Sequence, residues 1–64
     1  MDLILLLIEK SNGQKTYIEY DATTDFLNEY EYLSENYKLI TVIFLGKLNR
    51  KINTFEELFK KING

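Results

Sequence analysis

Six consecutive large apolar residues, Leu3–Ile8, constrain the fold of this chain more than any other feature. A strand with one solvated face alternates apolar and polar residues, because successive side chains point to opposite faces of the sheet. This run has no polar face, so we predict a central strand of a sheet that is covered on both sides. The run is too short to span a membrane, which takes about 20 apolar residues. Asp2 precedes it where a signal peptide carries positive charge, so we predict a cytoplasmic protein without a membrane segment.

The length and composition predict one small α+β domain over residues 1–64. Such a chain buries only about 60 % of the surface that its unfolded form exposes, so its stability is marginal. The sequence contains no Cys and no His. It therefore has no disulfide, no thiolate metal site, and neither the commonest metal ligand nor the usual general base near neutral pH. Oligomerisation stays open as a further source of stability.

An Asn-Gly pair after the apolar run predicts a β-hairpin. Asn12 and Gly13 suit the two central positions of a type I′ turn, since both positions need a positive φ. This turn would place Leu5 opposite Tyr20. Alternation along the strands then gives the sheet two faces. The first face carries Leu3, Leu5, Leu7, Ile18 and Tyr20, and the second carries Ile4, Leu6, Ile8, Tyr17 and Glu19.

The rest of the chain predicts a helix, a strand and a second helix. Apolar residues recur at helical spacing from Phe26 to Tyr37, which predicts a helix over residues 24–36 with several N-cap candidates before it. The β-branched and aromatic run 39–45 predicts a strand, which residues 47–52 could extend beyond a kink at Gly46. Thr54 with Glu57 three residues later forms a capping box that opens a C-terminal helix.

The predicted order is therefore ββαβα, with a three-stranded antiparallel sheet in the spatial order 2-1-3. A right-handed crossover through the first helix brings the third strand beside the first. The first helix should cover the first face. The second face has three candidate covers, which are the C-terminal helix, a second copy of the chain and a partner protein.

Charge is distributed unevenly, although the net charge is only −2 at pH 7. Residues 19–37 include six acidic and no basic residues, whereas residues 38–64 include six basic and two acidic residues. This asymmetry indicates either solvated helix faces or a charged pole that binds a partner. The basic residues of the C-terminal part are Lys38, Lys47, Arg50, Lys51, Lys60 and Lys61.

Catalysis is not expected of this chain. Ser11 and Ser34 have no His or Cys to activate them. Glu31 and Glu35 are neighbours on the predicted helix, but acid–base chemistry needs a cleft that raises the pKa of one carboxyl. A chain of this size is not expected to enclose such a cleft. We predict no catalytic residue, no metal site and no cofactor.

The acidic pole favours a protein partner over a nucleic acid. Carboxylates spaced along a helix can imitate DNA phosphates and occupy the groove of a DNA-binding enzyme. Tyr, which is interleaved with them here, is a favoured interface anchor. Nucleic-acid binding by the C-terminal basic residues is the weaker hypothesis at a pI near 5.0. The candidate partner-binding residues are Glu19, Glu29, Glu31, Tyr32 and Glu35.

Residues 2–45 also show a pattern that resembles a known family. The matching residues are Asp2 through Leu6, Gly13, Tyr17, Glu19-Tyr20 and Asp25-Phe26. In these features the chain is similar to small bacteriophage uracil-DNA glycosylase inhibitors, which are dimers with a three-stranded antiparallel sheet and one helix. The resemblance implies DNA mimicry together with an apolar pocket that captures a loop of the enzyme. It adds Tyr30 to the candidate residues, whereas Leu27 stands where the family has Glu.

Together these observations predict a small phage-type protein that binds and inhibits a host nucleic-acid enzyme in the host cytoplasm. A DNA-repair enzyme, uracil-DNA glycosylase, is the specific candidate from the resemblance. Two alternatives stay open. The chain could be an assembly module that forms a homodimer through the apolar second face, or a small nucleic-acid binder that uses its C-terminal basic residues.

Overall fold

The computed structural model describes residues 2–64 and confirms the α+β class. The elements are β1 (Leu3–Glu9), β2 (Lys15–Tyr20), α1 (Thr23–Asn36), β3 (Tyr37–Phe44), β4 (Lys47–Asn49) and α2 (Phe55–Asn63). The four strands form one antiparallel sheet in the order β2-β1-β3-β4. The predicted order 2-1-3 is confirmed, and the apolar run that opens the chain is an inner strand of the sheet.

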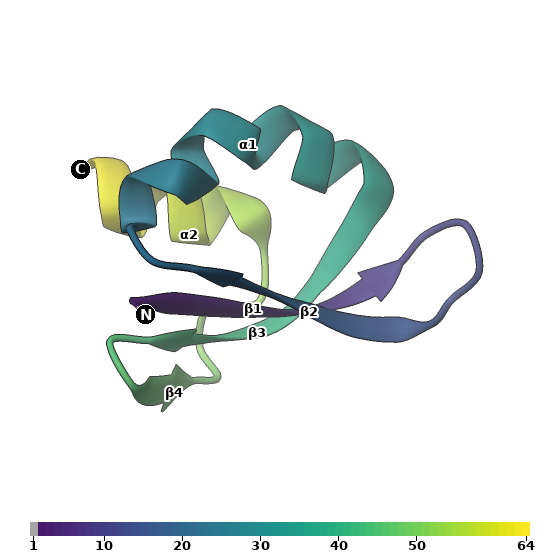
Figure 1. Cartoon of the computed structure of the whole chain (residues 1–64), viewed down its shortest axis with the longest axis horizontal. Coiled ribbons are helices and arrows are strands. Elements are labelled where there is room, and N and C mark those ends of the chain that lie inside the picture. The colour runs from purple at the N-terminus through teal and green to yellow at the C-terminus, as the bar shows by residue number, and fades with distance from the viewer. Residues whose placement is uncertain (1) are drawn as a thin grey trace.

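Both helices pack on the first face of the sheet (Figure 1). The side chains of Leu3, Leu5 and Leu7 on β1 are fully buried beneath them. The Phe26 ring of α1 stacks on the Phe55 ring of α2, with the ring centroids 6.3 Å apart. The predicted contents of the first face are therefore confirmed.

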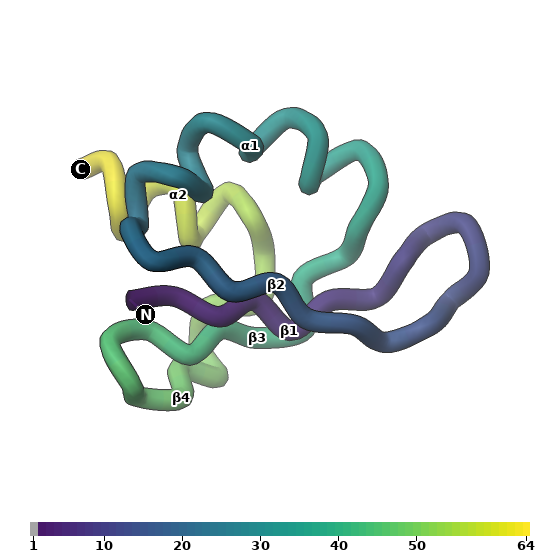
Figure 2. Tube along the Cα trace, in the orientation of Figure 1, coloured from purple at the N-terminus to yellow at the C-terminus, as the bar shows by residue number. Residues whose placement is uncertain are grey.

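The C-terminal helix, one of the three candidate covers of the second face, does not lie there. Its apolar stripe and that of α1 bury each other above the first face, so placing α2 on the other side would expose both stripes. Figure 2 shows no helix on the opposite side of the sheet within residues 2–64. We call that side the open face.

The predicted register of the β1–β2 hairpin is wrong by two residues. Leu5 pairs with Ile18, not with Tyr20, because four residues rather than two connect the strands beyond the Glu9–Gln14 backbone hydrogen bond of 2.8 Å. Asn12 does not adopt a positive φ and instead accepts a hydrogen bond from the Gln14 N–H through its side chain. A shift of two residues leaves every side chain on its predicted face.

A fourth strand replaces the predicted extension of the third. Leu45 and Gly46 have φ values of 51° and 81°, as the two central residues of a type I′ turn require. The chain therefore reverses, and Lys47 pairs with Phe44. On its other side β3 has a bulge, because Ile40 has no partner on β1 between the pairs that Leu39 and Thr41 form.

The two helices begin differently. The N-cap residue of α1 is Ala22, so none of the polar N-cap candidates around it provides a side-chain cap. At α2 the predicted cap is confirmed, since the Thr54 hydroxyl accepts a 3.2 Å hydrogen bond from the Glu57 N–H. Among residues 2–64, neither helix is long and apolar enough to cross a membrane.

Candidate functional site

The exposed side of α1 is the main candidate site. Its carboxylates, which we call the acidic surface, are all exposed, and the helix contains no basic residue. They are Asp25, Glu29, Glu31 and Glu35. The first and the last are ten positions apart, which is about 15 Å along the helix axis at 1.5 Å per residue. The average axial spacing of the four charges is thus about 5 Å, against about 3.4 Å for the phosphates of one DNA strand. Along its axis the helix therefore has about two-thirds of the charge density of one DNA strand.

One carboxylate of this surface is held in place by the sheet. The Tyr20 hydroxyl donates a hydrogen bond to Glu29 Oε1. Burial raises the pKa of Tyr20 above its ordinary value. The Glu29 carboxylate raises this pKa further, because it accepts a hydrogen bond from the neutral hydroxyl and would repel a phenolate. Tyr20 therefore stays neutral and donating at physiological pH.

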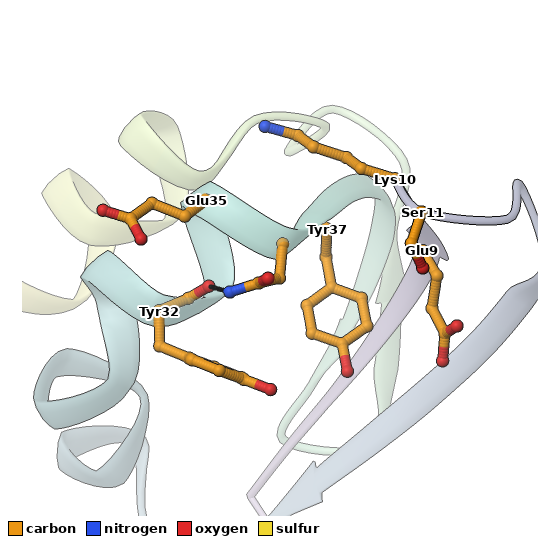
Figure 3. A pocket seen from close by; sticks show the side chains of 7 residues that line it. Glu9, Lys10, Ser11, Tyr32, Glu35 and Tyr37 are labelled. Atoms are coloured by element: carbon orange, nitrogen blue, oxygen red, sulfur yellow. Dashed lines mark hydrogen bonds between the residues drawn. The ribbon is translucent and has the colours of Figure 1, made fainter.

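Two tyrosines lie side by side at the C-terminal end of α1 (Figure 3). Tyr32 is 59 % exposed, and its ring lies edge-on to that of Tyr37, with the centroids 6.3 Å apart. They line a shallow hollow of about 430 Å³ together with Glu9, Lys10, Ser11, Glu35 and Asn36. Such an arrangement offers an apolar contact flanked by carboxylates, which suits a basic partner surface.

Neither Lys10 nor Tyr37 adds charge beside Tyr32 in this hollow. Lys10 does not reach the tyrosines, because its Nζ donates a 2.9 Å hydrogen bond to the Ser34 carbonyl at the end of α1. Partial burial raises the pKa of Tyr37, and the neighbouring Tyr32 and the Glu9 carboxylate raise it further. The Tyr37 hydroxyl is therefore uncharged at neutral pH.

The structure brings together most of the predicted site residues, though not all. Glu29, Glu31, Tyr32 and Glu35 lie exposed on one helix. Glu19 is separate from them, because it pairs with Ile4 and so lies on the open face.

Tyr30, which the family resemblance contributed, is half-buried. Its ring packs against Phe59 of α2, with the centroids 4.7 Å apart, and against Phe26 at 5.9 Å. Tyr30 therefore supports the contact between the two helices, and only part of its side chain can reach a partner.

Sequence reasoning missed two residues beside Tyr32. Tyr37 fitted the apolar stripe of the predicted helix, but it is the first residue of β3. Glu9 lies at the end of β1, far from Tyr32 in the sequence, and the two meet only because the base of the hairpin packs beside the end of α1. No local signal in the sequence identifies Tyr37 and Glu9 as neighbours of Tyr32.

The basic residues named in the weaker hypothesis are exposed. Lys47 and Lys61 line a second hollow, of about 460 Å³, beside the exposed side chains of Leu45 and Leu48. Comparison of the chain with known protein families, with curated proteins and with solved structures finds no match.

Proposed function

We propose that this chain is a non-catalytic inhibitor that docks the acidic surface of α1 and Tyr32 into the DNA-binding groove of a host nucleic-acid enzyme. The observation that carries the proposal is the helix itself. It exposes four carboxylates along about 15 Å without an intervening cation, and it exposes a tyrosine at its end.

Electrostatics supports this choice of partner. A groove that binds DNA is lined with cations, and a surface of opposite charge raises the association rate and orients the encounter. Charge alone gives little specificity for one partner over another, so the interface also needs a side chain that becomes buried and loses its water on binding. Tyr32 can supply it, because a large exposed aromatic side chain loses little conformational entropy when it is buried at an interface.

Uracil-DNA glycosylase is the first enzyme to test, because of the resemblance in residues 2–45. In that case Asp25 and Phe26 form the helix start that matches the inhibitor family, and Tyr30 matches the partner-binding tyrosine of that family. The proposal does not depend on this enzyme, since any host protein with a cationic groove wide enough to admit the α1 helix offers the same complementarity.

The experiment begins with capture of partners from a bacterial lysate on the immobilised chain, followed by uracil-excision assays with excess protein. We expect a DNA-processing enzyme to be retained and released by salt, because surface charges are screened within about 8–10 Å at physiological ionic strength. Tyr32→Ala should weaken binding by about tenfold or more, as removal of an interface anchor does.

Matched variants separate this surface from general effects. Glu31→Gln with Glu35→Gln should weaken binding by about tenfold, whereas Glu56→Gln with Glu57→Gln removes the same charge from α2 and should leave binding unchanged. Tyr17→Ala is the control for Tyr32→Ala, since Tyr17 is 62 % exposed but lies on the open face.

Two results would contradict the proposal. One is full excision activity together with a captured partner whose binding is unaffected by the α1 variants. The other is salt-sensitive binding of DNA that is lost on substitution of Lys47, Arg50 and Lys51, which would establish the nucleic-acid binder instead.

A further inference from the structure

The open face of the sheet is mainly apolar between charged corners. Strand pairing places its side chains in three rows that run across the strands. The first row is Glu19, Ile4, Ile43 and Leu48, the middle row is Tyr17, Leu6 and Thr41, and the third row is Lys15, Ile8 and Lys38. Only the corners are charged, and no helix covers these rows within residues 2–64.

The polar group in the middle of this face is already satisfied. The Thr41 hydroxyl donates a 2.7 Å hydrogen bond to the Asn49 carbonyl, so burying it leaves no unpaired donor. Around it, Tyr17 is 62 % exposed and Leu48 is 50 % exposed, because the side chain of each points to the open side of the sheet. A contiguous apolar patch of this kind, rimmed by charges, is typical of an association surface.

The charges on β2 indicate which molecule fits this face. Lys15 and Glu19 lie at equal distances on either side of Tyr17, two residues away in each direction. A two-fold axis that crosses the strands at the level of the middle row exchanges the first and third rows. It therefore places Lys15 of each copy against Glu19 of the other, and Ile4 of each against Ile8 of the other.

Other arrangements of two copies are less favourable. An axis parallel to the strands keeps each row on itself and reverses the strand order, so Lys15 would lie near the partner's Lys38 and Glu19 over the partner's Leu48. The first arrangement sets Lys38 over the partner's Ile43 instead, where its aliphatic stem can cover the apolar side chain. Self-complementary charge thus selects one two-fold axis.

We propose that two copies of this chain pack open face to open face about the two-fold axis that crosses the strands at Tyr17, Leu6 and Thr41. The dimer has four layers, with a sheet-on-sheet core and the helices of each copy outside. Aligned sheets pack about 10 Å apart at roughly −30°, which long side chains such as Lys15 and Glu19 can span. The acidic surface of α1 stays exposed in both copies.

The size of the face sets the expected affinity. Three rows, of which only the first reaches β4, cover at most roughly 15 Å by 19 Å, or about 300 Å² in projection, from the usual strand rise and spacing. This is well below the roughly 800 Å² of accessible surface per partner in a standard interface, even when surface relief is added. We therefore expect a dimer that dissociates in the micromolar range or above.

Sedimentation equilibrium of the whole chain from about 10 to 500 µM tests the proposal, a range chosen to bracket that affinity. Lys15→Glu and Glu19→Lys each replace two attractive contacts of the symmetric dimer by two repulsive ones. Each should raise the dissociation constant by about tenfold or more. The double variant with both substitutions restores opposite charges across the axis and should return the dissociation constant to near the wild-type value.

Controls keep the outcome specific to this face. Lys60→Glu and Glu31→Lys make the same charge changes on exposed helix positions and should leave dimerisation unchanged. A chain that stays monomeric up to 500 µM would overturn the proposal, and so would a dimer that the single substitutions do not weaken or the double substitution does not restore. Because Glu31 belongs to the proposed inhibitory surface and Lys15 does not, failure here is distinguishable from failure of the proposed function.

Discussion

At the scale of single residues, Leu45 is the least expected feature of the structure. It adopts a φ of 51°, a left-handed conformation that costs a residue with a β-carbon about 1–2 kcal/mol. Its side chain is 63 % exposed, so packing does not repay this cost. The turn is stabilised by a 2.7 Å hydrogen bond that the Leu45 N–H donates to the Asp2 carbonyl. The second positive φ of the turn falls on Gly46, which adopts it without steric cost.

Replacing Leu45 with Asn should therefore stabilise the protein. Asn tolerates the left-handed region better than Leu, so the free energy of unfolding should rise by about 0.5–1 kcal/mol. Urea denaturation at low micromolar concentration measures this change. Leu48→Asn, at an exposed strand position where no positive φ is found, should give no such gain. A loss of stability in Leu45→Asn would show that the leucine side chain makes a stabilising contact.

The Tyr20–Glu29 pair predicts how stability depends on alkaline pH. The pKa of Tyr20 is raised in the folded protein, so above the unfolded value of about 10 the unfolded state has lost a proton that the folded state keeps. Stability is therefore fully present below pH 10 and falls as the pH rises toward the folded pKa. Tyr20→Phe should make this fall shallower, though Tyr37, whose pKa is also raised, leaves part of it.

The same variant has a second effect at neutral pH. It removes a partly buried hydrogen bond to Glu29, which should lower the free energy of unfolding by about 1 kcal/mol. Urea denaturation at pH 7 and at several values above pH 10 measures both effects. An alkaline fall equally steep in wild type and variant would mean that Tyr20 ionises as freely when folded as when unfolded.

At the scale of elements, the two helices differ at their N-termini. Ala22 occupies the N-cap of α1 with the extended backbone typical of a cap, φ −123° and ψ 140°, but its methyl group cannot accept a hydrogen bond. Thr54 has nearly the same backbone geometry at α2 and does accept one. Helix α1 therefore relies on its packing through Phe26 and Leu33, both fully buried.

Opposite substitutions at the two caps should have opposite effects. Ala22→Ser supplies a missing acceptor and should stabilise the protein by about 0.5–1 kcal/mol, whereas Thr54→Ala removes one and should destabilise it by about 1 kcal/mol. Thermal unfolding followed by circular dichroism measures both. The prediction fails if Ala22→Ser lowers the melting temperature, since the half-buried position of Ala22 would then not admit a hydroxyl.

At the scale of the whole molecule, β1 separates a closed side from an open one. Leu5 is fully buried under the helices, while its neighbour Leu6 is half-buried on the open face. A domain of this size has about 3–10 kcal/mol of stability in total. A single core cavity is therefore a large perturbation for it.

The two neighbouring leucines should respond differently to truncation. Leu5→Ala should cost about 2–5 kcal/mol and leave much of the protein unfolded, because the site loses both transfer energy and packing. Leu6→Ala should cost roughly 1 kcal/mol in the monomer, since less apolar area is lost from burial there. Urea denaturation at a concentration below dimerisation compares them. Equal losses would mean that the open face is as enclosed as the core.

The local patterns of the sequence predicted the type and order of the major elements. The alternation of side chains along the hairpin strands and the helical spacing from Phe26 onward assign the side chains of each element to a face, and this determines the first face. The resemblance to phage inhibitors and the inhibitory role remain proposals. For the candidate site, the sequence identified the acidic helix and Tyr32, but it grouped Glu19 with them, although Glu19 lies on the other side of the sheet.

The tertiary structure alone decided the hairpin register, the fourth strand and the side on which α2 packs. The hydrophobic pattern could not determine the hairpin register, because a shift of two residues leaves every side chain on the same face. The reversal at Leu45 and Gly46 was hidden because Leu rarely adopts a positive φ. Leu3–Ile8 by itself required cover on both faces. Only the mutual burial of the α1 and α2 stripes decided that α2 does not cover Ile4, Leu6 and Ile8.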